Sequence, residues 1–394
     1  MNIGIEATSA TETQKAGVGY YTANLIQAMV RLGREDHHYT FYLRKPWSDP
    51  LWLTESERHP KFASKVLSFP YLWAQVRLPF ELWRHPQDVY FFPSPVIPLL
   101  YQPARSVITI HDVAFLFFPE CFAPLLRRWL SIATPRGIAQ ARKIIAVSAA
   151  TKQDLMTYYG VPAEKVVVIH HGVHEMYRPL SEKPSAQDTL NAIKQKYQIE
   201  GVYLLCLGTL QRRKNIPRLL QAFSILKQKY NIPHKLVLVG QKNPDLPEQE
   251  IFATIEGLLL QKEVIWTGYI PEQDKPVLLS GAEVFVLPSL YEGFGMPLLE
   301  AVACGVPVAC SNTSSLPEVV GESGVLFDPY NVDNITETMY RVLSDEGLRR
   351  NLRQQGLQRV KEFSWERCAQ QTLEVLEEVG NLTPFPCERR AGVR

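Results

Sequence analysis

Several features that assign a protein to a class by themselves are missing from this sequence. No run of about 18 apolar residues occurs, so we expect no membrane-spanning helix. Residues 1–5 predict a β-strand, not the cationic and apolar regions of a signal peptide. The six cysteines form no Cys-x-x-Cys pair and no zinc-like spacing with histidine, which indicates buried free thiols in a reducing cytoplasm.

An excess of charge of one sign is also missing. The chain of 394 residues has 42 Lys and Arg against 40 Asp and Glu, which excludes a polybasic nucleic-acid-binding protein. The two parts of the chain differ, however. Residues 1–178 have 19 basic and 14 acidic residues and eight of the nine histidines, whereas residues 179–394 have 23 basic and 26 acidic ones. The length predicts two or three domains with sizeable cores.

Strand-like segments alternate with helical segments along the whole chain. Runs such as 235–239 and 284–287 are apolar on both faces, as central strands of a parallel sheet are. Residues 216–230 have apolar side chains at helical spacing. Strands are predicted at 2–7, 39–44, 65–69, 88–92, 106–111, 143–147, 165–169, 203–208, 235–239, 263–267, 283–287, 306–310 and 325–327. This alternation predicts an α/β fold with two doubly wound domains.

A polar segment with glycine and proline marks the boundary between these domains. Gly172, Pro179 and Pro184 follow the strand at 165–169, so we place the linker at about 175–185. The predicted units are an N-terminal domain over 1–178, a C-terminal domain over 179–364, and a helix with a frayed tail over 365–394. In two-domain α/β proteins the ligand binds at the carboxyl ends of strands, so functional residues should directly follow strands.

The densest pattern of functional residue types lies at 288–311. Glu292 and Glu300 are separated by seven residues, and Gly293 and Gly295 closely follow the first of them. A strand is predicted to end here and a helix to begin, so backbone N–H groups would face an anion or sugar hydroxyls. Glu300 would lie about one turn into the helix, where its carboxylate can accept two hydrogen bonds from a vicinal diol.

This string resembles the Glu-x7-Glu signature of family 4 retaining glycosyltransferases. The family has the GT-B fold, in which two Rossmann-like parallel-sheet domains face each other and a C-terminal helix crosses back to the first domain. The resemblance implies that Glu300 holds the nucleotide ribose and that Glu292 faces the donor sugar. It also implies donor contacts by the residues that follow Glu292, namely Gly293, Phe294, Gly295 and Met296.

A second segment, 208–215, resembles the family's donor-phosphate motif. It begins at Gly208, directly after a predicted strand, and precedes a helix. Its cations Arg213 and Lys214 can neutralise a diphosphate. Many members carry arginine directly after the glycine, where this chain has Thr209, so one phosphate contact of the family is left in doubt.

The N-terminal part contributes a glycine pair. Gly17 and Gly19 resemble the first-loop glycines of the family, where the backbone approaches the donor phosphates or the acceptor. Thr22 occupies the third position of a Gly-x-Gly-x-x-Gly fingerprint, which argues against a nicotinamide site. A plain turn is the alternative interpretation of this pair.

Two further segments of the N-terminal part agree with the resemblance. His111, followed by Asp112 at a strand end, resembles the histidine that reaches a hydroxyl of the transferring sugar. The alternative is that the two side chains only make hydrogen bonds within their loop. The segment 147–154 resembles a helix start of the family, with Ser148 as its N-cap.

The resemblance implies an enzyme that moves a hexose from a nucleotide diphosphate sugar with retention of configuration. We expect a front-face route, in which the departing diphosphate oxygen takes the acceptor proton while the protein positions the reactants and stabilises negative charge. The catalytic candidates are His111, Glu292, Arg213 and Lys214. No Asp-x-Asp occurs, so we expect activity without divalent metal, no metal site and no cofactor apart from the nucleotide-sugar co-substrate.

Donor and acceptor are predicted from the same resemblance. Segments 111–115, 208–215 and 289–295 look like the bacterial mannosyltransferase branch, so GDP-mannose is the expected donor and a UDP-sugar the alternative. The expected acceptor is a growing glycan or lipid-linked glycan, as in polysaccharide biosynthesis.

Two segments raise the question of a membrane. The stretch 121–153 has six basic and no acidic residues and is interleaved with apolar side chains such as Trp129, and the stretch 71–83 is aromatic and amphipathic. Each stretch could contact an anionic membrane. The alternative for the first is a solvated basic face, and the alternative for the second is packing in the core or in the acceptor cleft. We expect a cytoplasmic protein, with peripheral membrane contact as an open alternative.

Two other classes of function are weaker alternatives. A sugar-nucleotide epimerase shares the two-domain fold, but it would need additional acid–base carboxylates and would lack the spacing of Glu292 and Glu300. A catalytically silent nucleotide-binding scaffold would have lost site residues that this chain retains.

Overall fold

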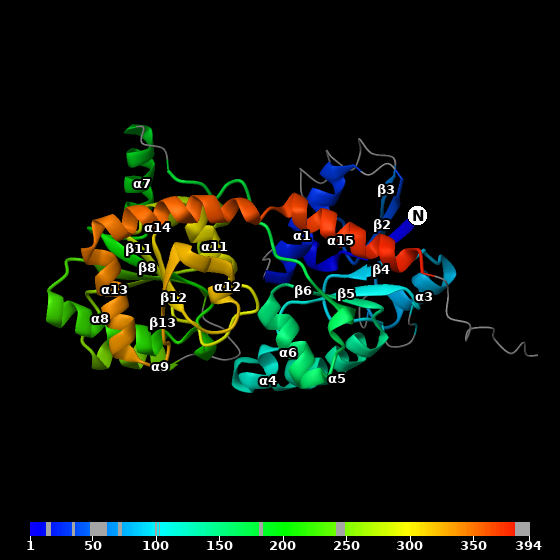
Figure 1. The fold of residues 1–394 in the computed structure, drawn as a ribbon, viewed down its shortest axis with the longest axis horizontal. Coiled ribbons are helices and arrows are strands. Elements are labelled where there is room, and N and C mark those ends of the chain that lie inside the picture. Colours follow the sequence, from blue (N-terminus) through cyan, green and yellow to red (C-terminus); the bar gives the residue numbers. More distant parts are fainter. Residues whose placement is uncertain are drawn as a thin grey trace, which may run out of the picture.

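Two parallel β-sheets follow one another along the chain in this computed structural model (Figure 1). The structure describes residues 1–12, 17–33, 36–47, 61–69, 73–98, 101, 103–180, 184–241 and 249–382. Each sheet has helices on its faces and forms its own domain, so the predicted α/β fold with two Rossmann-like domains is confirmed.

The first sheet has seven strands in the order β3-β2-β1-β4-β5-β6-β7. Its strands are β1 (Asn2–Glu6), β2 (His38–Leu43), β3 (Phe62–Val66), β4 (Val89–Phe92), β5 (Ser106–Ile110), β6 (Lys143–Ala146) and β7 (Val166–Val168). Its helices are α1 (Gly17–Leu32), α3 (Arg77–Arg84), α4 (Ala114–Phe117), α5 (Pro124–Gln140) and α6 (Ala149–Tyr159). The strand order reverses between β1 and β4, and such a switch point is where open α/β sheets bind ligands.

The second sheet has six strands in the order β10-β9-β8-β11-β12-β13, with its switch point between β8 and β11. Its strands are β8 (Tyr203–Leu207), β9 (Lys235–Val239), β10 (Val264–Gly268), β11 (Val284–Leu287), β12 (Val308–Ser311) and β13 (Gly324–Phe327). The helices of this part are α7 (Pro184–Lys196), α8 (Ile216–Tyr230), α9 (Gln249–Gly257), α10 (Lys275–Ser280), α11 (Met296–Ala303), α12 (Leu316–Val320), α13 (Val332–Ser344) and α14 (Glu346–Arg359).

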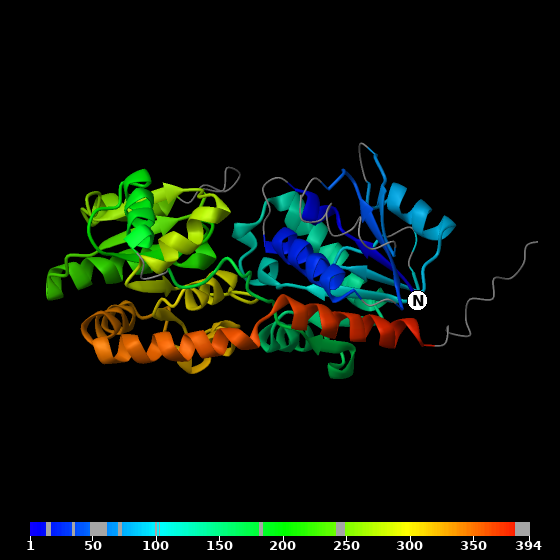
Figure 2. The ribbon, with the colours of Figure 1, turned by 90° about the horizontal axis from the view of Figure 1, so that it is seen from above.

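The last helix, α15 (Trp365–Gly380), returns to the first domain. Its buried residues Leu373 and Leu376 share one apolar cluster with Leu25 of α1 and Ile3 of β1. Figure 2 shows α14 and α15 following one another along one side of the molecule, from the second domain to the first. The predicted crossing helix therefore completes the core of a domain whose other elements lie far earlier in the sequence.

Most predicted strands agree with the structure within one or two residues, and the helix predicted at 216–230 is α8. The bounds predicted for the strand at 65–69 are wrong by three residues, because β3 spans Phe62–Val66. This strand lies at the edge of the sheet and none of its residues is buried, so its sequence lacks the continuous apolar run of a central strand. The domain limits at 178 and 364 stay predictions, and the predicted tail at 384–394 lies outside the described residues.

None of the described helices combines the length and apolar character that crossing a membrane requires. Five cysteines, Cys121, Cys206, Cys304, Cys310 and Cys368, are buried free thiols, as predicted, and Cys387 lies outside the described residues.

Candidate active site

A cleft of about 550 Å³ lies between the two domains, at the carboxyl ends of both sheets. It is lined by the start of α1, the end of β5, the loop after β8 and the loop from β11 into α11. The last two loops flank the switch point of the second sheet. Eleven of the twelve predicted site residues line this cleft: Gly17, His111, Gly208, Arg213, Lys214, Glu292, Gly293, Phe294, Gly295, Met296 and Glu300. Gly19 does not, because it is buried within α1.

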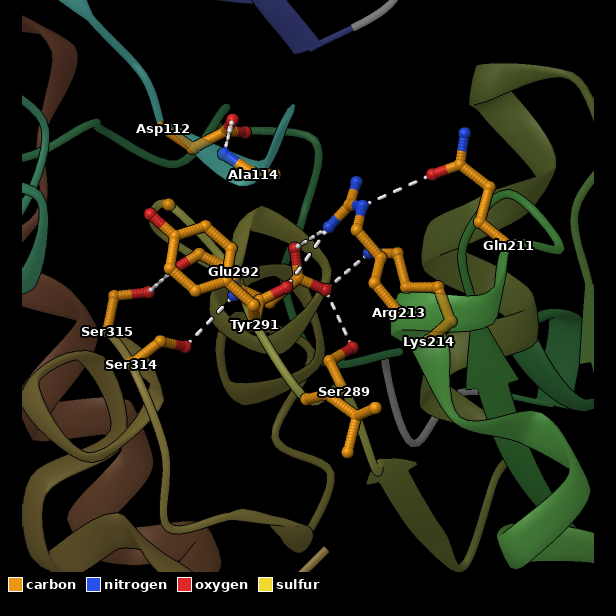
Figure 3. A network of polar contacts seen from close by, with 12 residues as sticks. Asp112, Ala114, Gln211, Arg213, Lys214, Ser289, Tyr291, Glu292, Ser314 and Ser315 are labelled. Atoms are coloured by element: carbon orange, nitrogen blue, oxygen red, sulfur yellow. Dashed lines mark hydrogen bonds and ion pairs between the residues drawn. The ribbon is translucent and has the colours of Figure 1, made fainter. Parts of the chain in front are cut away.

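Glu292 lies at the centre of a charged cluster made by two loops (Figure 3). Nη1 of Arg213 donates to Oε2 of Glu292 over 2.9 Å, and Nζ of Lys214 donates to Oε1. Oγ of Ser289 also donates to Oε1, over 2.7 Å. Arg213 and Lys214 lie in a single 3₁₀ turn, Arg212–Lys214, between β8 and α8, so the short loop directs two neighbouring cations at one carboxylate.

The cluster is almost fully withdrawn from water. Side-chain exposure is 18% for Arg213, 9% for Lys214 and 8% for Glu292. Burial alone would raise the pKa of the Glu292 carboxyl, but the charges of Lys214 and Arg213 outweigh it and lower this pKa to about 2. Glu292 is therefore a carboxylate at neutral pH, and it holds both cations beside the cleft.

Gly293 allows the two domains to approach each other next to this cluster. A Cβ atom there would lie 1.9 Å from the carbonyl oxygen of His111 and 2.9 Å from Cβ of Asp112, so only glycine fits. Oγ of Ser148 donates to the carbonyl oxygen of Gly293 over 2.7 Å. Ser148 is also the N-cap of α6, as predicted, and accepts from the N–H of Thr151.

The turn after Gly293 leads into α11. Gly295 has φ of +95°, the left-handed region that favours glycine, and the next residue begins the helix. Glu300 lies one turn into α11, as the spacing predicted. Its side chain is also buried. Burial and the charge of Glu272 raise the pKa of Glu300 to about 7, although Lys275 opposes the shift.

His111 enters the cleft from the first domain. Its Nε2 lies 2.9 Å from the carbonyl oxygen of Pro93, so Nε2 carries the proton and Nδ1 is free to act as an acceptor. Burial lowers the pKa of His111, although the Pro93 carbonyl and Asp112 oppose the shift. At neutral pH the ring is therefore uncharged and can accept a hydrogen bond from a hydroxyl group.

The prediction from sequence missed a second histidine of the cleft. His171 follows β7, and its ring centroid lies 5.6 Å from that of His111. It is buried, and neither of its ring nitrogens has a hydrogen-bond partner among the described residues. Its position shortly after β7 is the signal that could have found it. Tyr20, inside the glycine-pair segment, and Lys275, outside every motif, also line the cleft and were missed.

Comparison with known protein families divides the chain in the same way as its two sheets. A family model described as Glycosyltransferase Family 4 matches residues 16–175, and one described as Glycosyl transferases group 1 matches residues 191–359. Among curated proteins, the O-antigen chain mannosyltransferase B of Escherichia coli is 30% identical over 382 residues, which cover 94% of this chain and 98% of that protein.

Solved structures share the architecture at low sequence identity. A glycosyltransferase from Rickettsia africae superposes with a TM-score of 0.72 at 18% identity, covering 97% of this chain and 99% of that one. Anabaena HepE, solved in complex with UDP-glucose, superposes with a TM-score of 0.69 at 19% identity and covers 96% and 100% of the two chains. At this identity the likeness establishes the arrangement of the two domains.

Proposed function

The chain belongs to family 4 of the glycosyltransferases and has the GT-B fold, and on this premise we propose that it transfers mannose from GDP-mannose to a glycan or lipid-linked glycan. It is a hexosyltransferase, which sets aside the epimerase and the silent scaffold. The proposed transfer retains the anomeric configuration and needs no divalent metal.

The observation that carries the proposal is the pair of buried cations beside the cleft. Arg213 and Lys214 supply two positive charges at a place where burial strengthens electrostatic interactions. A departing nucleoside diphosphate needs this stabilisation in the transition state. Glu292 holds the two cations in place before the donor binds. When the donor binds, its diphosphate replaces part of the interaction between the cations and Glu292. Positive side chains thus take the role that a metal ion has elsewhere.

The remaining cleft residues have complementary roles in this proposal. Glu300 accepts hydrogen bonds from the ribose hydroxyls, and the amide groups around Gly295 face the phosphates at the N-terminus of α11. His111, neutral and with Nδ1 as acceptor, orients a hydroxyl of the transferring sugar. The leaving phosphate oxygen takes the acceptor proton, so no carboxylate nucleophile is required.

The mannose assignment is supported by a relative of nearly the same length that is a mannosyltransferase by name. The UDP-glucose bound to Anabaena HepE keeps a UDP-sugar as the alternative donor. Calorimetric titration with GDP and UDP separates the two: tighter binding of UDP would refute the GDP assignment. Transfer from GDP-mannose to mannose oligosaccharides, with the product linkage determined by NMR, tests the reaction itself.

A membrane-facing role of the first domain is the second part of the proposal. The start of α5 exposes Leu125 and Leu126 beside Arg127 and Arg128, and the helix lies on the outer side of the first domain (Figure 1). Apolar and basic side chains on one helix suit the interface of an anionic membrane that carries a lipid-linked acceptor. Co-sedimentation with phosphatidylglycerol vesicles at low salt should be lost in the Arg127→Glu, Arg128→Glu variant.

A further inference from the structure

A second interdomain pocket, distinct from the cleft, lies at the carboxyl ends of β11, β12 and β13. Its volume is about 400 Å³, within the usual range of small-ligand sites. It shares no lining residue with the cleft, yet Tyr291 lines the pocket and the next residue, Glu292, lines the cleft. The two cavities therefore border the same stretch of chain, at Tyr291 and Glu292.

Aromatic rings from both domains form the walls of this pocket. The ring of Tyr291 lies 5.1 Å from that of Phe117 and 6.4 Å from that of Phe118, centroid to centroid. Tyr330 lines the pocket with 59% of its surface exposed, although the Arg218 guanidinium lies 5.5 Å from its ring. Such rings offer flat apolar faces to the C–H groups of a pyranose.

Polar groups lie among the rings. Asp154 accepts a hydrogen bond from the Tyr291 hydroxyl through Oδ2, over 2.7 Å, and its Oδ1 has no partner among the described residues. The exposed side chain of Gln153 donates to Oγ1 of Thr157 over 3.1 Å, and Ser314, whose Oγ accepts from a backbone N–H, also lines the pocket. Rings with a carboxylate, an amide and a hydroxyl match a neutral sugar, which has apolar faces and a rim of hydroxyls. A hydrocarbon chain would leave Oδ1 of Asp154 without a partner, whereas a sugar hydroxyl can donate to it.

The pocket is also connected to the charged cluster of the cleft. The N–H of Glu292 donates to Oγ of Ser314 over 2.9 Å, and Nη1 of Arg213 donates to the carbonyl oxygen of Tyr291 over 3.2 Å. Figure 3 shows Ser314 and Tyr291 beside Glu292. Residues that line the pocket therefore help to position two groups that the donor diphosphate needs.

We propose that this pocket is a distal subsite for a neutral hexose residue of the acceptor glycan, several sugars away from the one that receives mannose. The inference rests on the proposed function, because it takes the acceptor to be a glycan. The enzyme would then prefer acceptor chains that are long enough to occupy both the cleft and this pocket.

The test measures transfer from GDP-mannose to acceptors of one to four mannose residues, with the full chain and with Tyr330→Ala. We expect KM for the three- and four-residue acceptors to rise about tenfold. KM for the shorter acceptors, kcat and the affinity for GDP should stay unchanged. Tyr330→Phe should behave as the wild type, because the ring is retained. An equal effect on every acceptor length, or no effect, would overturn the subsite.

A binding measurement separates this inference from the proposed reaction. Saturation-transfer NMR with mannotetraose alone needs no donor and no turnover. Loss of the signal in Tyr330→Ala, but not in the control Tyr340→Ala outside the pocket, supports the subsite even if GDP-mannose proves to be the wrong donor. A signal unchanged in Tyr330→Ala overturns it, and so does displacement of the sugar by farnesyl phosphate, which would identify a lipid site.

Discussion

The hydroxyl of Ser148 in the first domain donates a hydrogen bond of 2.7 Å to the carbonyl oxygen of Gly293 in the second. The serine is the N-cap of α6, and the glycine follows the carboxylate that pairs with the two cations. This contact joins the two walls of the cleft directly, so the geometry of the site depends on how closely the domains approach each other.

Gly293→Ala should therefore separate the walls without unfolding either domain. Its methyl group would clash with the His111 carbonyl oxygen at 1.9 Å, and a displacement of about 1 Å can cost roughly 100-fold in rate. We expect kcat to fall by that order while circular dichroism stays unchanged. Gly257→Ala, where the added methyl meets no atom within 4 Å, is the matched control. Full activity of Gly293→Ala would refute the importance of this contact.

Lys214→Met should impair both stability and catalysis. It leaves Glu292 with one cation in a buried site, and breaking a buried pair costs about 3–5 kcal/mol. The free energy of unfolding, measured with urea, should fall accordingly, and kcat/KM should fall at least about 100-fold. Adding Glu292→Gln then leaves the buried Arg213 without its carboxylate, so neither stability nor activity should recover. Recovery of activity in the double variant would contradict the role of Lys214.

Glu300→Gln should stabilise the protein at alkaline pH and weaken donor binding. The folded pKa of Glu300 is about 7 against an ordinary 4.5, so its contribution to stability is fully present below pH 4.5 and lost as the pH rises through 7. The glutamine variant should be about 2–3 kcal/mol more stable at pH 8, and the gain should vanish towards pH 5. Urea unfolding across this range measures the difference, with the exposed Glu374→Gln as control.

Leu373→Ala in the crossing helix should destabilise the first domain. The side chain is fully buried in the cluster that contains β1 and α1, and such truncations cost about 2–5 kcal/mol. Thermal unfolding should show a lower Tm, whereas Glu374→Ala, one residue along and exposed, should leave Tm unchanged. An unchanged Tm for Leu373→Ala would mean that α15 contributes little to this core.

The fold and most of the cleft could be predicted because their signals lie within short stretches of sequence. The alternation of strands and helices indicates the two sheets, and Glu292 and Glu300 lie in one continuous motif. The pairing of Glu292 with Arg213 and Lys214 could not be predicted, since it depends on how two loops meet in space. The aromatic pocket could not be predicted either, because its lining residues come from five separate segments of the sequence.

The position of α15 has a consequence for synthesis of the chain. Most of the first domain is synthesised before the second, but one apolar face of it is covered by residues 365–380, which are synthesised after the second sheet. The second sheet can form while this face still lacks its cover. The first domain is thus completed only after the second sheet has been synthesised, and a nascent chain released before residue 365 carries an exposed core.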